Sequence, residues 1–171
     1  MLCGALHAPA GAATVAPLTF DQLVNASAVV IDARVSRVDG QWSDDRTRID
    51  TVVTVDVVGR FKGAPGGTMR FSIPGGRVGR YVNLIPGAPT FAAGDRAVLF
   101  LASRGPRLPA LTGFTQGIYR VTVDARTGAT LVIPPVVEST TRLVPRGDVR
   151  RKPVSIEVFE AAVRTVEAVV R

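Results

Sequence analysis

The chain predicts two paired strands in one stretch, Arg48-Ile-Asp-Thr-Val-Val-Thr-Val-Asp-Val-Val-Gly-Arg-Phe-Lys-Gly-Ala-Pro-Gly-Gly-Thr-Met-Arg-Phe-Ser-Ile73. Apolar and polar residues alternate on both sides of a turn over residues 62–68. Side chains of a strand point alternately to its two faces, so one face would be buried and the other solvated. Gly and Pro supply the backbone angles of the turn. The residues expected to face inward are Ile49, Val53, Val55, Val57, Phe61, Met69, Phe71 and Ile73.

The overall composition favours one β-rich domain. A length of 171 residues fits a single domain, and 46% hydrophobic residues are enough for a core. Valine is abundant and aromatic residues make up only 6%, which favours strands. The net charge of +7 is carried almost wholly by arginine. Either the coding preference of a GC-rich genome or an anion-binding role would explain this charge. No run of about 18 apolar residues occurs, so no membrane-spanning helix is expected.

The N-terminal residues 1–13 predict export. Small apolar residues lead to Ala10-Gly11-Ala12, which has the form of a signal-peptidase site. We therefore interpret residues 1–13 as a residual signal peptide, and expect a periplasmic or extracellular protein. A lipoprotein signal with Cys3 as the lipidated residue is the alternative.

Cysteine and histidine are each present once, as Cys3 and His7. If the signal is removed, the mature chain has no thiol nucleophile, imidazole base or ordinary zinc site. The remaining candidate cluster, Asp39, Asp44 and Asp45, does not match the spacing of an EF-hand loop. The sequence therefore predicts no catalytic residue, no metal ligand and no cofactor. Carboxylate pairs of glycoside hydrolases leave no local spacing signal, so such a hydrolase stays as one alternative.

A short helix and a first strand precede the central pair. Thr19 is placed to cap the helix, and Gln22 completes a capping box. Residues 28–38 alternate as a strand does, but Val38 falls out of phase, which predicts a bulge near Arg37. The polar positions of this strand, expected to face solvent, are Asp32, Arg34 and Ser36.

Several later elements are also predicted. Residues 39–47 form a polar loop that holds Trp42, the only tryptophan. The apolar run at residues 96–101 is typical of a strand buried on both faces. Residues 117–123 and 129–133 form a hairpin.

The long Gly/Pro-rich segment Gly75–Thr90 is the predicted contact surface. A loop of this length inside a compact domain usually has a function. Its basic, glycine-rich beginning lacks the Lys-Ser/Thr ending of a phosphate-binding P-loop, so an ordinary glycine turn is the simpler interpretation. The residues predicted to contact a partner are Pro74, Gly75, Gly76, Arg77, Gly79, Arg80 and Tyr81.

The C-terminal region divides into a linker and a helix. Residues 134–153 form a basic, proline-containing linker with Arg142, Arg146, Arg150, Arg151 and Lys152. Residues 154–171 form an amphipathic helix that we expect to pack on the barrel. Its apolar face consists of Ile156, Phe159, Val163, Val166 and Val170.

Five motifs together point to a family. They are Ala28-Val-Val-Ile-Asp-Ala-Arg-Val35, the segment 51–63, Ile73-Pro-Gly-Gly-x-x-Gly79, the segment 89–101 and Gly113-Phe-Thr-Gln-Gly-Ile-Tyr-Arg-Val121. Over residues 20–123 the chain resembles uncharacterised bacterial exported proteins with an OB-like barrel, which are distantly similar to the netrin-like modules of tissue inhibitors of metalloproteinases. Some of these proteins are encoded beside matrixin-type zinc proteases. The inhibitors' N-terminal zinc-binding cysteine and their disulfides have no counterpart here, so the resemblance implies neither their mechanism nor a catalytic residue.

We therefore expect a mainly β fold, with a small OB-like β-barrel at residues 14–133, a short N-terminal helix and a C-terminal amphipathic helix. The expected function is that of a non-enzymatic exported module that binds another exported protein, with a matrixin-type metalloprotease as one candidate. The alternative is a polyanion-binding protein, for lipopolysaccharide, anionic lipid or nucleic acid, that uses Arg77, Arg80 and the basic linker. Nucleic acid is disfavoured because few aromatic residues are available to stack on bases. The sequence does not fix the oligomeric state.

Overall fold

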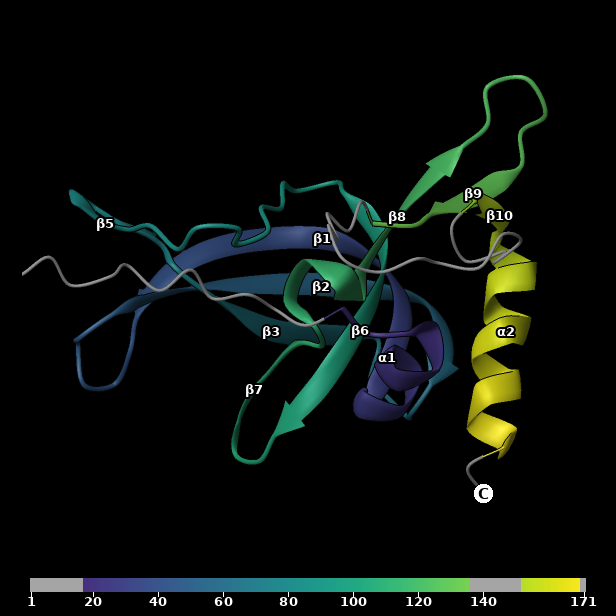
Figure 1. Ribbon diagram of the computed structural model, residues 1–171. Helices are drawn as coiled ribbons and strands as arrows, with labels where there is room; N and C mark the ends of the chain where they lie inside the picture. Colours follow the sequence, from purple (N-terminus) through teal and green to yellow (C-terminus); the bar gives the residue numbers. More distant parts are fainter. Residues whose placement is uncertain (1–16, 136–151, 170–171) are drawn as a thin grey trace, which may run out of the picture.

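The chain folds into a mainly β structure with a short helix before the strands and a longer one after them (Figure 1). The computed structural model describes residues 17–135 and 152–169. The predicted signal segment 1–13 and most of the predicted linker 134–153 lie outside the described residues. The main strands are β1 (Val29–Trp42), β2 (Ile49–Lys62), β3 (Thr68–Pro74), β6 (Arg96–Arg104), β7 (Arg107–Leu111) and β8 (Ile118–Val123). The other elements are α1 (Phe20–Ala26), β4 (Gly76–Val78), β5 (Tyr81–Asn83), the 3-10 helix η1 (Phe114–Gly117), β9 (Thr130–Ile133), β10 (Val154–Ser155) and α2 (Ile156–Val169).

Five strands form a closed circuit of neighbours. The order is β1-β2-β3-β7-β6, and β6 pairs again with β1. All of these neighbours are antiparallel except β3 and β7, which run parallel and share one residue pair, Ser72 with Ala110. The circuit has the five-stranded, partly open character of an OB-like barrel. It is not an evenly closed barrel, because the β3–β7 seam rests on this one pair.

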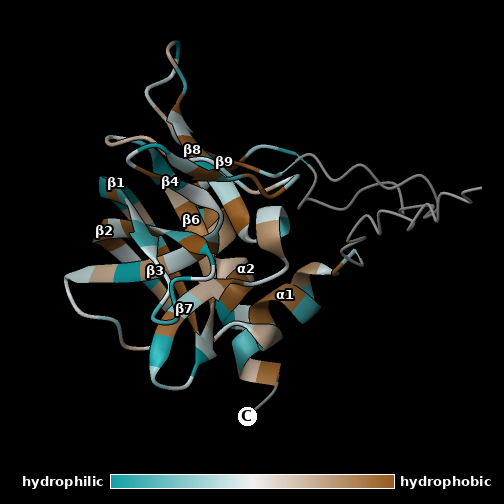
Figure 2. Cartoon of the chain, turned by 90° about the vertical axis from the view of Figure 1, so that its left-hand side faces the viewer, coloured by the Kyte–Doolittle hydropathy of each residue, from teal (hydrophilic) through white to brown (hydrophobic). Residues whose placement is uncertain are grey.

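The strands β1 and β2 form the longest ribbon of the sheet. Their register shifts between Val35 and Arg37, which agrees with the predicted bulge. The ribbon continues to the pair Trp42 and Ile49, so the prediction of a polar loop over residues 39–47 is wrong for its first four residues. Cross-strand pairing satisfies their backbone groups despite the polar side chains. The alternation of hydrophobic and hydrophilic residues along β2 and β3 can be followed in Figure 2.

Two apolar cores lie on opposite faces of β1 and β6. The inner core lies within the barrel and includes Ile31, Val55 and Phe71. The outer core lies between the barrel and the helices and includes Val30 and Phe100. β1 is consequently buried on both faces over residues 30–33, and β6 over residues 97–101, as the apolar run at residues 96–101 predicts.

The outward position predicted for Asp32 is wrong. Its side chain belongs to the outer face of β1, but only 2% of the residue is exposed. Arg96 on the neighbouring strand donates two hydrogen bonds to its carboxylate, from Nε at 3.0 Å and from Nη2 at 2.6 Å. A buried carboxylate requires such compensation. The ion pair thereby allows a charged residue at a buried position of β1.

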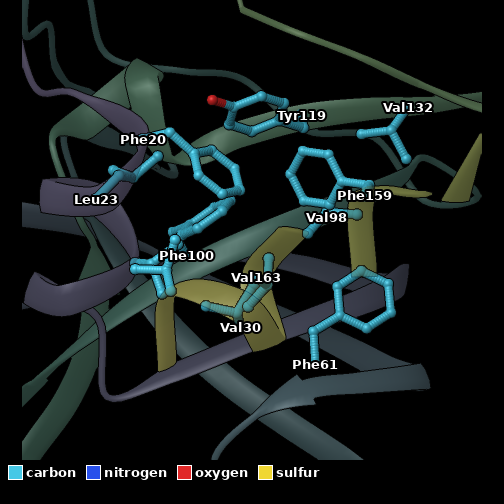
Figure 3. Packing of buried hydrophobic residues seen from close by; sticks show 12 residues of the cluster. Phe20, Leu23, Val30, Phe61, Val98, Phe100, Tyr119, Val132, Phe159 and Val163 are labelled. Carbon is cyan, nitrogen blue, oxygen red and sulfur yellow. The ribbon is translucent and has the colours of Figure 1, made fainter. Parts of the chain in front are cut away.

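The helices close the outer core. Thr19 and Gln22 form the predicted capping box at the start of α1. Phe159 and Val163 of α2 pack into the same cluster as Phe20 of α1 (Figure 3), and the rings of Phe20 and Phe159 meet edge to face at 5.5 Å. The two helices, at opposite ends of the sequence, thus share one core with the barrel.

Two hairpins extend from the barrel in different directions. The β8–β9 hairpin has the predicted position, and β9 continues the sheet to β10 immediately before α2. The β4–β5 hairpin lies at the end of the molecule away from α2 (Figure 1). Among the described residues, no helix has the length and apolar character needed to cross a bilayer.

Candidate partner-binding surface

The predicted contact segment begins with a β-hairpin, and its description as an irregular loop is wrong at this point. β4 and β5 pair through Arg77 with Val82 and through Val78 with Tyr81. Gly79 and Arg80 form the turn, and Gly79 has a positive φ of 56°. Each strand of the hairpin has only three residues. A strand this short shows no alternation of apolar and polar residues in the sequence, so the hairpin was not predicted.

The hairpin is seated on the β1–β2 ribbon through glycines. A Cβ added at Gly40 of β1 would lie 1.9 Å from the carbonyl oxygen of Arg77. A Cβ added at Gly76 would lie 2.4 Å from Oγ1 of Thr51, and the φ of Gly76 is 140°. Only glycine permits backbones to approach this closely. These positions therefore fix where the hairpin lies.

Hydrogen bonds hold the base of the hairpin. The Gly75 N–H donates to the Ile49 carbonyl at 3.0 Å, and the Thr51 hydroxyl donates to the Gly75 carbonyl at 2.7 Å. Asn83 Nδ2 donates to the same Ile49 oxygen at 3.4 Å. The buried backbone at the start of the hairpin is therefore satisfied by the ribbon beneath it.

An aromatic pair marks the outer part of this surface. The rings of Trp42 and Tyr81 meet edge to face with centroids 5.4 Å apart. The Arg80 guanidinium lies 5.1 Å from the centre of the Tyr81 ring and donates to the Tyr81 hydroxyl at 2.9 Å. Both rings remain well exposed, Trp42 at 38% and Tyr81 at 49%. The contacts orient the rings without covering them.

Apolar side chains continue the exposed surface beyond the aromatic pair. Leu84 is 84% exposed and directly follows β5, and its neighbour Ile85 is also exposed. Ile85 packs back toward Gly75, whose hypothetical Cβ would lie 3.0 Å from Ile85 Cγ1. We define the hairpin surface as Trp42, Arg77, Arg80, Tyr81, Val82, Leu84 and Ile85.

The predicted contact residues divide into three groups. Arg77, Arg80 and Tyr81 are exposed on the hairpin surface, whereas Gly75, Gly76 and Gly79 shape its backbone. Pro74 ends β3 and lines a different hollow on the barrel. Val82, Leu84 and Ile85 lie inside the predicted contact segment Gly75–Thr90, but they were not among the residues predicted to contact a partner. Trp42 lies outside that segment, and sequence reasoning missed its place on the surface. The adjacent exposed apolar pair Leu84 and Ile85 was the available signal in the sequence.

Two of the acidic residues near this surface, Asp39 and Asp45, have structural partners. The Ser43 hydroxyl donates to Asp45, as does the Thr47 N–H, and these bonds lower the pKa of Asp45 to about 2. Asp39 pairs with Arg37 at 2.7 Å. Within residues 17–135 and 152–169, no group of three or more His, Cys, Asp or Glu side chains is arranged to hold a metal ion.

Comparison with known proteins gives no assignment. The chain matches no protein-family model, no curated protein and no solved structure. The similarity to exported OB-like proteins therefore stays a prediction from the quoted motifs. Any function has to be argued from the geometry of the surface itself.

Proposed function

We propose that the protein is a non-enzymatic binding module that holds another exported protein through the hairpin surface. The observation that carries this proposal is the exposed pair Trp42 and Tyr81 beside Leu84, which is 84% exposed. Apolar side chains gathered on the surface of a folded domain mark sites of interaction. Aromatic residues and arginine are also the residue types that contribute most to binding energy at protein interfaces.

The anchoring of the hairpin supports the same function. Close packing at Gly40 and Gly76 fixes the backbone before any partner arrives. The contact between Arg80 and Tyr81 restricts the tyrosine ring further. Binding to a surface of this kind loses less conformational entropy, so more of the contact energy remains as affinity.

The charge of the surface indicates the chemistry of the partner. Arg77 and Arg80 are exposed beside the apolar residues, while the nearby Asp45 and Asp39 are already engaged by other groups. A matching partner would present an apolar centre with acidic residues at its edge. A matrixin-type metalloprotease is the candidate that the sequence resemblance suggests.

Binding can be tested with the double variant Tyr81→Ala/Leu84→Ser. Binding of the full chain to a matrixin-type protease from the same organism would be measured by surface plasmon resonance. Loss of two central contacts should weaken binding by about thirtyfold or more, since one such residue typically contributes about 2 kcal/mol. The control Val123→Ser/Val158→Ser changes two exposed valines that lie outside the hairpin surface. Equal affinity of the two variants would refute the assignment of the surface.

Export is the second part of the proposal, and it is supported by Ala10-Gly11-Ala12. Expression of the native gene should yield a mature N-terminus near Ala13. Recovery of a chain that begins at Met1 in the cytoplasm would contradict it.

A further inference from the structure

A second surface feature lies on the outer face of the barrel, separate from the hairpin surface. It is an open hollow of about 540 Å³ between the β1–β2 turn, strand β3 and the β6–β7 turn. Sites for small ligands commonly have volumes of about 300–1,000 Å³. The hollow is lined by Arg48, Asp50, Ser72, Pro74, Arg104 and Arg107.

The lining is strongly cationic. Three arginines and one aspartate give it a net charge of +2. Arg48 Nε lies 3.3 Å from Asp50 Oδ2, but about half of the Arg48 side chain remains exposed. Within the part of the chain that the structure describes, neither Arg104 nor Arg107 has an ion pair. The hollow therefore offers uncompensated guanidinium groups to a ligand.

Arg104 and Arg107 bring two like charges together beside the hollow. The two residues are directly opposite one another in the β6–β7 pairing, across a two-residue turn that begins with Gly105 at φ 63°. Like charges opposite one another on neighbouring strands destabilise a sheet. A register shift between Ala102 and Arg104 also redirects the end of β6, and such bulges are common beside binding sites. An anion between the two guanidinium groups would offset their repulsion.

We propose that this hollow binds an anionic saccharide, a sugar that carries sulfate, phosphate or carboxylate. The planar guanidinium groups of Arg104 and Arg107 match the oxygens of such anions. The Ser72 hydroxyl and the free oxygen of Asp50 can bond to sugar hydroxyls, and Pro74 offers an apolar face to the ring. The lining has no aromatic side chain on which a base could stack, so nucleic acid fits the hollow less well.

The test uses the full chain and isothermal titration calorimetry with a short heparin oligosaccharide, which is sulfated, and a short oligogalacturonide, which carries carboxylates. The variant R104Q/R107Q removes both opposed charges from the hollow. The variant R60Q/R70Q removes two exposed arginines that do not line it. Both variants therefore change the net charge of the protein equally.

R104Q/R107Q should weaken saccharide binding about tenfold or more, which corresponds to the loss of one charge-assisted hydrogen bond, while R60Q/R70Q should retain most of the affinity. Without ligand, the melting temperature of R104Q/R107Q should equal or exceed that of the wild type, because this variant lacks the pair of like charges. The sulfated and carboxylated probes together show which anion the hollow prefers.

Two results would overturn the proposal. Equal losses in the two variants would mean that binding follows net charge alone. The second result is a single-stranded oligonucleotide that binds as tightly as the saccharides and depends equally on Arg104 and Arg107. The ligand of the hollow would then be nucleic acid and not a saccharide. Partner binding at the hairpin surface should be the same in R104Q/R107Q as in the wild type, so failure of one proposal is distinguishable from failure of the other.

Discussion

Neighbouring residues of β2 face entirely different surroundings. Val55 is fully buried in the inner core, whereas Thr54 is only partly buried and its carbonyl accepts a bond from the Ser36 hydroxyl. Val55→Asp should cost several kcal/mol, a large part of a total stability of about 5–15 kcal/mol, because the carboxylate has no partner there. Thr54→Asp should change the free energy of unfolding by less than about 1 kcal/mol. Urea denaturation of the two variants measures the difference, and similar losses would contradict the assigned faces.

Alternation of this kind could be predicted from the sequence, but the burial of Asp32 could not. Alternation shows which residues share a face, and Asp32 does lie on the face opposite Ile31 and Ala33. Whether that second face is solvated depends on elements elsewhere in the chain. The helices cover this face near Val30, and at Asp32 the charge is compensated by Arg96, from a strand 64 residues away. The alternation of residues within β1 contains no information on where the helices pack or on which residue pairs with Asp32.

Asp95 provides a residue-scale test against pH. A hydrogen bond from the Ala92 N–H, assisted by Arg120, lowers the pKa of Asp95 from its ordinary value of 3.8. Its carboxylate is therefore more stabilised in the folded chain than in the unfolded one. That contribution is fully present above the unfolded pKa and is lost as the pH falls through the lower folded pKa. The stability gap between wild type and Asp95→Asn should be constant near neutrality and shrink below about pH 4. Denaturation curves across this range check it, and a constant gap down to the acid limit would disprove it.

At the scale of elements, the hairpin depends on close backbone approach to β1. Gly40→Ala would place a Cβ 1.9 Å from the Arg77 carbonyl oxygen, so the hairpin must shift. Such overpacking typically costs about 1–3 kcal/mol. Movement of the hairpin also separates Tyr81 from Trp42, the only tryptophan, so the emission of Trp42 should change.

Gly67→Ala is the matched control for the hairpin. A Cβ at Gly67 meets nothing within 4 Å, and its φ is not positive. It should leave the emission and the unfolding free energy nearly unchanged. An unaltered Trp42 spectrum in Gly40→Ala would show that the hairpin does not rest on this contact.

The elements differ in how far their sequences predict them. The capping box at Thr19, the β8–β9 hairpin and the apolar run of β6 carry strong local signals, and all three are present. The β4–β5 hairpin has only three residues in each strand, and its stability comes from the ribbon beneath it. The hollow is harder still to predict, since Arg48 and Arg104 meet there only after the barrel closes. The Arg-Gly-Pro-Arg turn over residues 104–107 was the available local signal.

At the scale of the whole molecule, the C-terminal helix is part of the outer core, between the barrel and the helices. Phe159 and Val163 are buried against strands as well as against Phe20 of α1, and the rings of Tyr119 and Phe159 lie 4.9 Å apart. Burial of each such side chain contributes about 1.5–3 kcal/mol. This packing should hold the helix even if the chain before it is cut.

Cleavage of the chain can test that packing. The segment Leu143-Val-Pro-Arg146-Gly147, outside the described residues, matches the preferred sequence of thrombin, and the composition of residues 134–153 predicts an extended, accessible segment. We expect thrombin to cut after Arg146 and the fragment 147–171 to co-elute with the barrel on gel filtration. Phe159→Ala should release the fragment, because it removes the side chain that contacts both Phe20 and Tyr119. Val158→Ala, at an exposed position of the same helix, should not. Separation of the unmodified fragment would mean that covalent linkage, and not packing, keeps the helix on the barrel.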